Sequence, residues 1–211
     1  MALPVECRCR QRRVGSSTGA AKAGSASVLQ ESGARVSWRT VYDLLDEHGQ
    51  TILVETKTWS IQEQDGKYLL DLEWRGDAKR AVTVERFYVG GLFIRMPWHK
   101  GIAGEVINAA GQRNNQAEQQ RAIWTDVGMA IAGRDDWGHI AILDHPDNTG
   151  FPIAWRVDSE LGVGPSLQIL QNWRLTEGES EVTRYRLIVY TGQHDPTVLH
   201  RAWTAYAGGS R

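Results

Sequence analysis

The stretch TILVETKTWSIQEQDGKYLLDLEWR, residues 51–75, decides the fold. Residues 51–64 alternate apolar and polar side chains for most of their length, which is the pattern of a strand with one buried face. Asp65-Gly66 follows, and this dipeptide favours a two-residue turn because both residues tolerate a positive φ. Residues 67–75 then read as a second strand. The stretch therefore predicts an antiparallel hairpin.

The segment before this hairpin, residues 34–46, shows the same alternation, with Val36, Trp38, Thr40 and Tyr42 on one face. Residues 47–50 supply a turn, so a three-stranded meander is expected. Further short strands are predicted downstream, with Gly, Pro, Asp or Asn between them, at residues 81–87, 91–98, 104–110, 121–131, 137–144, 153–158, 167–175 and 182–190. This spacing predicts an all-β protein built as an antiparallel β-sandwich.

One short C-terminal helix is the exception to the β pattern. Asp195 is a suitable N-cap, and Pro196 suits the first helical position. Apolar residues recur near helical spacing at Val198, Trp203 and Tyr206, and Gly208-Gly209 ends the pattern. We expect this helix to pack on an edge of the sheet.

Composition narrows the class of protein. The chain has 211 residues with 24 basic and 25 acidic side chains, and the charges are interleaved after the N-terminus, so no nucleic-acid footprint is present. No apolar run approaches the roughly 18 residues of a membrane-spanning helix, so no membrane partner is expected. The nine tryptophans suit both sheet cores and the flat faces of sugar rings.

Residues 1–33 are predicted to be a disordered, basic, Ala/Gly/Ser-rich tail, and residues 34–211 a single β-sandwich domain. Cys7 and Cys9 lie in the tail, where they cannot staple the body of the chain. No secretory signal is seen, so a cytoplasmic location is expected. The Arg-rich start also resembles an organelle transit peptide, and a mis-set or truncated start is a further interpretation.

The loop DHPDNTGFPIAWR, residues 144–156, follows an apolar strand and is the first candidate site. In one interpretation Asp144 orients the imidazole of His145, which then acts as acid or base, while Asn148 shapes the loop. In the other, the loop is only an Asx-type turn that bonds its own backbone. Trp155 and Arg156 should emerge on opposite faces of the next strand, because adjacent strand residues alternate.

Two further polar clusters lie at predicted strand ends. Arg95, Trp98 and His99 combine an anion clamp with an aromatic platform and a hydrogen-bonding ring, although an exposed basic loop is an equally simple interpretation. Trp124 and Asp126 lie in an apolar strand, where a buried carboxylate needs a partner. Arg95 is the partner expected for Asp126, as an ion pair or beside a substrate.

No metal or cofactor site is predicted. His-x-His, His-Glu-x-x-His and Cys-x-x-Cys spacings are absent from the sequence, as are nucleophile-elbow, phosphate-loop and dinucleotide motifs. The acids are scattered, so no pair of glycosidase carboxylates can be assigned.

The order of motifs resembles the PmoA-like family, a domain of unknown function labelled "methane oxygenase". The landmarks are GGLFIRMPW (90–98), GEVINAAG (104–111), RAIWTDVGM (121–129), HIAILDHPDNTGFPIAWRVD (139–158) and RYRLIVYTG (184–192). The resemblance covers the chain from about residue 34 to its end. It implies a sandwich akin to the galactose-mutarotase-like supersandwich, in bacteria and in carbohydrate-related gene company.

The sequence also differs from the family pattern in two respects. Family members begin with a further β-rich half that contains a His-His-Arg-Gly element, so this chain resembles the C-terminal portion of a larger domain. Mutarotase-like enzymes use a histidine acid and a late-strand glutamate base, whereas the late glutamates here fall in the turn at residues 177–181. If the domain is truncated, an unpaired sheet edge should invite self-association.

These observations support two main hypotheses and leave open whether the protein is an enzyme. The first is a carbohydrate-associated protein with catalytic His145 and Asp144, and a sugar-like ligand held by Arg95, Trp98, His99, Trp124, Asp126 and Asn148. The second is a non-catalytic sugar-binding or interaction module that uses the same aromatic residues. The oxygenase activity in the family label is disfavoured, because copper needs clustered ligands that the sequence does not supply.

Overall fold

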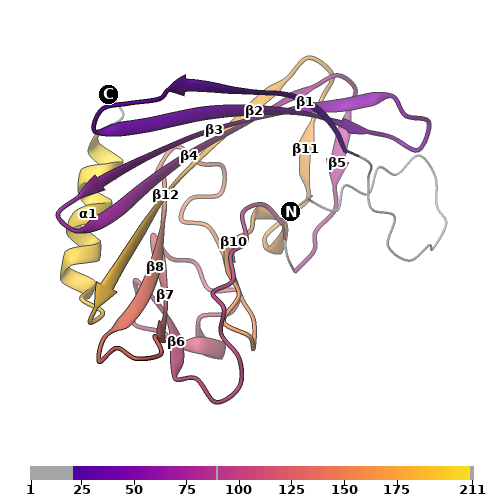
Figure 1. The fold of residues 1–211 in the computed structure, drawn as a ribbon. Helices are drawn as coiled ribbons and strands as arrows, with labels where there is room; N and C mark the ends of the chain where they lie inside the picture. The colour runs from indigo at the N-terminus through magenta and orange to yellow at the C-terminus, as the bar shows by residue number, and fades with distance from the viewer. Residues whose placement is uncertain (1–20, 89, 210–211) are drawn as a thin grey trace.

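The computed structural model describes residues 21–209 except residue 89, and its architecture is an antiparallel β-sandwich with one α-helix (Figure 1). The larger sheet has eight strands in the order β1-β2-β3-β4-β12-β8-β7-β6. Its strands are β1 (Ala21–Gln30), β2 (Arg35–Leu45), β3 (Thr51–Gln64), β4 (Lys67–Ala78), β6 (Gly104–Asn108), β7 (Trp124–Ala130), β8 (Trp137–Asp144) and β12 (Ser180–Gly192). The fold class predicted from the sequence is confirmed.

Two small sheets complete the sandwich. One pairs β9 (Trp155–Val157) with β10 (Val163–Pro165), and the other pairs β5 (Val82–Val84) with β11 (Trp173–Leu175). Two short 3-10 helices, η1 (Asn114–Gln116) and η2 (Leu167–Ile169), lie in the connections. No helix within the described ranges is long and apolar enough to cross a membrane.

The β3–β4 hairpin forms around the predicted turn. Asp65 and Gly66 have φ values of 54° and 71°, so both adopt the left-handed conformation that a tight hairpin turn requires. The register runs without a slip from Gln64 opposite Lys67 to Leu53 opposite Ala78. This hairpin fixes which side chains of β3 and β4 share a face.

Three predictions about elements were wrong. Residues 21–30, expected in a disordered tail, form β1, because the edge of β2 supplies pairing from Ala21–Leu44 to Gln30–Ser37. Residues 1–20, with both cysteines, lie outside the described part of the chain. Residues 91–98 form no strand beyond an isolated Ile94–Val163 bridge, since Gly91 has a φ of 83° and Pro97 cannot donate to a ladder. Residues 167–175 begin as η2 and are strand only in β11.

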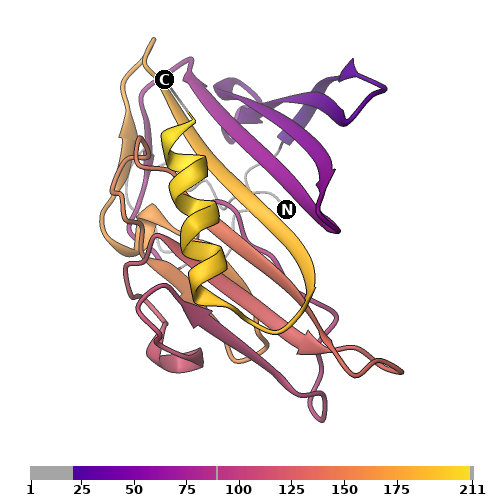
Figure 2. The same ribbon diagram turned by 90° about the vertical axis from the view of Figure 1, so that its left-hand side faces the viewer.

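The large sheet has two faces with different covers (Figures 1 and 2). The outer face carries α1 (Pro196–Gly208), which packs Leu199 and Tyr206 on Trp124, Ala141, Leu143, Ile188 and Tyr190. The inner face is turned toward the small sheets and shares two apolar clusters with them. The predicted helix and its N-cap are confirmed, with the Asp195 side chain accepting hydrogen bonds from the N–H groups of Thr197 and Val198. Its expected position was wrong, because the helix packs on the face of β7, β8 and β12 and not on a sheet edge.

The two edges of the large sheet also differ. At β6, the N–H of Val106 donates to Asn114 Oδ1 and that of Asn108 donates to the carbonyl of Gln112, so the following loop covers the edge. At the other end of the sheet, β1 pairs only with β2 among the described strands, so its second edge is unpaired. Self-association through such an edge stays a prediction.

Candidate functional site

The predicted catalytic loop is ordered by its own carboxylate. Asp144 is fully buried, and its carboxylate accepts hydrogen bonds from the N–H of His145 (3.0 Å), the N–H of Ile153 (2.8 Å) and Asn148 Nδ2 (2.8 Å). Asn148 ties the loop to β12, since its Oδ1 accepts from the Arg184 N–H at 2.8 Å. The described hydrogen bonds of Asp144 thus hold the loop backbone, which corrects the expectation that this carboxylate orients the His145 ring.

The same loop anchors the helix. His145 is 1% exposed and meets the Tyr206 ring of α1 edge-on at 5.1 Å. Trp203 of α1 donates from Nε1 to the carbonyl oxygen of Asp144 at 2.8 Å. Burial raises the pKa of Asp144 to about 6 against the lowering effect of its hydrogen bonds, and burial lowers the pKa of His145. This loop therefore forms a docking platform for the C-terminal half of α1.

A second polar group, which we call the outer-face cluster, consists of the buried residues Asp126, His139 and Tyr190 and the partly exposed His194. One oxygen, Asp126 Oδ2, lies 2.9 Å from Nδ1 of His139, 2.9 Å from Nδ1 of His194 and 3.0 Å from the Tyr190 hydroxyl. Burial alone raises the pKa of Asp126, but the two histidine hydrogen bonds outweigh it and the net pKa lies below its ordinary value. His194 immediately precedes the N-cap of α1, so the cluster holds the start of the helix.

The Arg95–Asp126 pair expected from the sequence is wrong. Arg95 forms ion pairs with Asp158 and Glu160 at the surface, while the histidines occupy Asp126. Trp124 is buried in the outer-face core, with its ring 5.9 Å from that of His194. Arg95 and Asp126 therefore stabilise different parts of the molecule.

The remaining predicted residues lie apart from these. Trp98 donates from Nε1 to the Ile102 carbonyl at 2.7 Å, and the exposed His99 contacts the carbonyl of Lys100 at 3.2 Å. Trp155 is buried and Arg156 pairs with Glu118, so the prediction of opposite faces is confirmed. The eight residues proposed to line one pocket fall into three groups, in the 95–99 loop, in β7 and in the 144–148 loop, and no described side-chain hydrogen bond or ion pair joins one group to another.

Within the described residues, no group of three or more His, Cys, Asp or Glu side chains is placed to hold a metal ion. Both histidines of the outer-face cluster direct Nδ1 at the same carboxylate oxygen. The three donors of the cluster all reach Oδ2, whereas the buried Oδ1 of Asp126 has no hydrogen-bond partner among the described residues.

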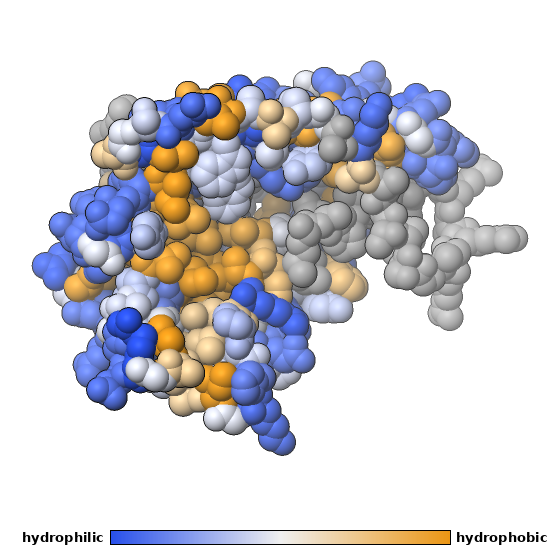
Figure 3. Space-filling view, in the orientation of Figure 1, coloured by the Kyte–Doolittle hydropathy of each residue, from blue (hydrophilic) through white to orange (hydrophobic). Residues whose placement is uncertain are grey.

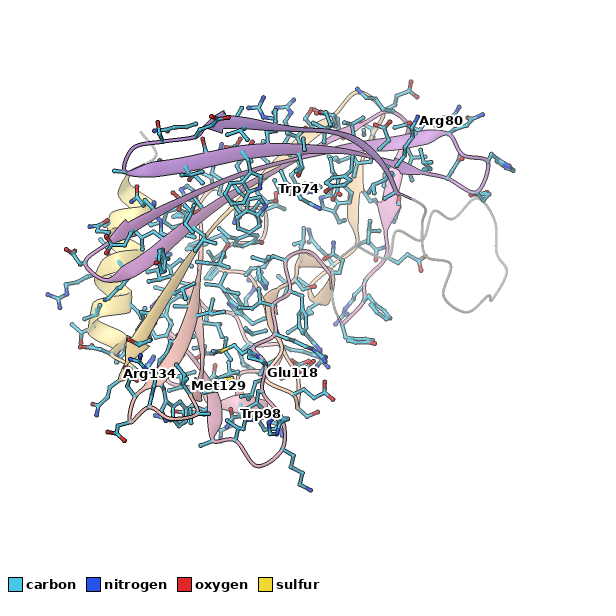
Figure 4. The ribbon with its side chains drawn as sticks, in the orientation of Figure 1. Trp74, Arg80, Trp98, Glu118, Met129 and Arg134 are labelled. Atoms are coloured by element: carbon cyan, nitrogen blue, oxygen red, sulfur yellow. The ribbon has the colours of Figure 1, made fainter. Side chains whose placement is uncertain are left out.

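A different set of polar and aromatic residues lies on the inner face of β2, β3 and β4. We call it the inner-face cluster: Trp38, Tyr42, Glu55, Lys57, Trp59 and Trp74. Figure 3 shows that the molecule is hollowed below β1–β4 and that hydrophobic residues gather there, and Figure 4 shows Trp74 pointing from β4 toward this hollow. The aromatic members and Lys57 are half-buried, whereas Glu55 is only 4% exposed.

The buried carboxylate of Glu55 holds the side chains of Trp74 and Lys57 in place. Its Oε1 accepts a hydrogen bond from Trp74 Nε1 at 2.7 Å, and its Oε2 lies 3.2 Å from Lys57 Nζ. A buried carboxylate needs such donors, and the charge-assisted bonds hold both partners in place. Lys57 Nζ also lies 5.4 Å above the centre of the Tyr42 ring, as a cation–π contact.

The indole of Trp74 is held in one orientation. A Cβ added to Gly76 would come within 2.4 Å of this indole, so the ring lies directly on the glycine backbone. Trp173 of β11 contacts it edge-on, with the ring centres 5.9 Å apart. Beside it, Trp38 and Trp59 stack at 6.4 Å with 15° between their planes. The result is a rigid, half-exposed aromatic surface with a charged pair at its edge.

Sequence reasoning missed this cluster, although the signal was present. The turn at residues 65–66 sets Lys57 opposite Trp74 and Glu55 opposite Gly76. Counting back from Asp65-Gly66 therefore places Glu55, Lys57, Trp59 and Trp74 on one face. The polar residues at the end of β8, which the sequence indicated as the site, lie instead in the platform under α1.

Comparison with solved structures finds likenesses of low identity. An α-galactosidase of family GH36, AgaA from Geobacillus stearothermophilus, matches with 10% identity and a TM-score of 0.49 over 84% of this chain and 29% of that one. A galactose mutarotase related enzyme from Lactobacillus acidophilus matches with 6% identity and a TM-score of 0.38 over 79% and 71% of the two chains. The chain thus spans less than a third of the α-galactosidase, and nothing about activity follows from either likeness.

Among curated proteins, no significant match to the sequence was found. The matching family model is the "Family of unknown function (DUF6807)", and the match extends over residues 8–204. It does not bear the PmoA-like label suggested by the order of motifs. Because the match spans most of the sequence, the chain belongs to the DUF6807 family of unknown function.

Proposed function

We propose that the protein binds carbohydrate through the inner-face cluster. The observation that carries this proposal is Trp74, whose indole rests on Gly76, donates to the buried Glu55 and stays half-exposed toward the hollow. A rigid indole loses little conformational entropy when a ligand stacks on it. Sugar rings present flat C–H faces and outward hydroxyl groups, and they need both a stacking surface and charged hydrogen-bonding groups beside it.

Lys57 and Glu55 supply the polar part of such a site. The Lys57 ammonium has three donors, of which one is directed to Glu55, so it can also donate to a ligand hydroxyl. Lys57 is 29% exposed at its side chain, which allows this contact. Tyr42, Trp38 and Trp59 extend the aromatic surface on the neighbouring strands.

A binding role is better supported than a catalytic one. The enzymatic hypothesis places proton transfer on His145 and Asp144, but these residues are buried beneath α1. In the inner-face cluster, both oxygens of Glu55 accept hydrogen bonds from protein donors. No observation on the described residues favours the oxygenase alternative.

A glycan microarray tests the proposal directly. The purified chain should bind a defined set of glycans, and Trp74→Ala should reduce that signal at least about tenfold, since the loss of one buried aromatic contact is worth 1.5 kcal/mol or more. Trp98→Ala is the matched control, because it removes a tryptophan at the opposite end of the molecule (Figure 4). The proposal fails if no glycan binds, or if Trp98→Ala lowers binding and Trp74→Ala does not.

A further inference from the structure

Two adjacent aromatic side chains outside the inner-face cluster are exposed. Phe87 is 47% exposed and Tyr88 is 52% exposed, and their ring centres lie 4.2 Å apart with planes tilted by 39°. Exposing two adjacent aromatic rings leaves a large apolar area in water. Such a patch on a soluble domain commonly marks a binding surface.

The backbone beneath this pair is fixed. The Arg86 N–H donates to Asn172 Oδ1 at 2.7 Å, and the Phe87 N–H donates to the Gln168 carbonyl at 3.0 Å. The Arg156 guanidinium lies 5.2 Å from the centre of the Tyr88 ring and is itself paired with Glu118. The pair is therefore presented on a supported backbone, with planar polar side chains beside it.

The pair is linked by packing to the inner-face cluster. Val84 of β5 lies opposite Trp173 of β11, and Trp173 contacts Trp74. Phe87 follows Val84 by three residues, so its backbone lies within about 11 Å of Val84 along the chain. These neighbour relations bound the separation of the two surfaces to a length that a chain of several sugar units can span.

We propose that the ligand is an oligosaccharide, with one sugar unit on Trp74 and a more distant unit on the Phe87–Tyr88 pair. This inference rests on the proposed carbohydrate binding. Aromatic rings give the second subsite its stacking surface, and Arg156 and Glu118 give it hydrogen-bonding groups. The second subsite selects for chain length, while the first contacts every bound sugar chain.

The experiment uses the strongest glycan from the microarray and its shorter fragments down to the single sugar unit. Dissociation constants are measured by calorimetry for the unaltered protein, for Trp74→Ala and for the double variant Phe87→Ala/Tyr88→Ala. The double variant should weaken binding of the longest chain about tenfold and leave the single unit within about twofold, since it removes one stacking contact. Trp74→Ala should weaken binding of every length. Both altered aromatic residues are exposed, so the double variant should keep its fold, which circular dichroism checks.

Equal affinity of the double variant and the unaltered protein for the longest chain would overturn the second subsite and leave the carbohydrate proposal intact. Equal weakening at every length would also overturn it, because the pair would then belong to the first subsite. If no glycan binds the unaltered protein, the proposed function and this inference both fall.

Discussion

The two faces of the large sheet carry similar side chains in opposite circumstances. On the outer face, Asp126 accepts hydrogen bonds from His139, His194 and Tyr190, and all of these except the partly exposed His194 are buried. On the inner face, a buried glutamate holds a lysine and a tryptophan that remain half-exposed. The outer polar groups hold the helix in place, whereas the inner ones present a surface. A dense cluster of titratable residues is thus no guide to a ligand site until its exposure is known.

The largest effect is expected at Asp126. Asp126→Ala removes the only described acceptor for Nδ1 of His139 and His194 and leaves buried donors unpaired, so the free energy of unfolding should fall by about 3–5 kcal/mol. Urea unfolding followed by circular dichroism measures this. Asp136→Ala, at an exposed pair with Arg134, should leave the stability unchanged. Equal stability of the two variants would contradict the structural role of the outer face.

The pH dependence of stability should separate the buried acids. The pKa of Asp144 is raised from 3.8 to about 6, so the folded protein binds this proton more tightly than the unfolded chain does. Its contribution to stability is present below about pH 4 and is lost as the pH rises through 6, a change of about 3 kcal/mol. Asp126 has a lowered pKa, so its contribution is lost only as the pH falls below the ordinary value.

Asp144→Asn has no titrating group at that position. The stability of the unaltered protein relative to this variant should therefore decrease between pH 4 and pH 7, in unfolding titrations run at each pH. A relative stability that does not change with pH would contradict the burial of the Asp144 carboxyl in the platform beneath α1.

Two glycines give a matched test of the two faces. A Cβ on Gly128 would come within 2.4 Å of the His139 ring, and one on Gly76 would come within 2.4 Å of the Trp74 ring. The His139 ring is held by Asp126 and stacks on Tyr190 at 4.7 Å, so Gly128→Ala should cost about 2–3 kcal/mol of stability. A Cβ on Gly76 would push the Trp74 ring out of the position that Glu55 and Trp173 hold. Because this ring is only half-buried, Gly76→Ala should cost less stability than Gly128→Ala and should weaken glycan binding.

Thermal unfolding and the glycan assay, run on both glycine variants, measure the two effects. The comparison breaks down if Gly76→Ala is the more destabilising variant, or if it binds glycans as well as the unaltered protein does.

The sequence predicted much of the fold because its signals are local. The Asp65-Gly66 turn and the alternation around it give the β2–β4 meander, and Asp195-Pro196 gives the start of α1. Strand β1 was missed because its composition is that of a linker and its stability comes from pairing with β2. A strand that is stabilised mainly by its partner cannot be recognised from its own composition, even when the partner is the next segment of the chain.

The site was harder to predict for the same reason. His145 directly follows β8 and Asp126 lies within β7, and α1, from fifty or more residues downstream, packs over this part of the sheet. Asp126 finds His194 as its partner, a residue that no local pattern connects to it. The inner-face cluster was accessible to register counting, yet its half-exposure depends on how the small sheets pack.

The most direct test of the distinction between the faces is an NMR titration of the tryptophan indole N–H signals with the strongest glycan from the microarray. The chain has nine tryptophans, and they occupy both faces and the loops. The account predicts that the signals of Trp38, Trp59 and Trp74 shift with the bound fraction, while those of Trp124 and Trp203 beneath and on α1 stay in place. Shifts at Trp124 and Trp203 with none at Trp74 would contradict it and return the site to the outer face.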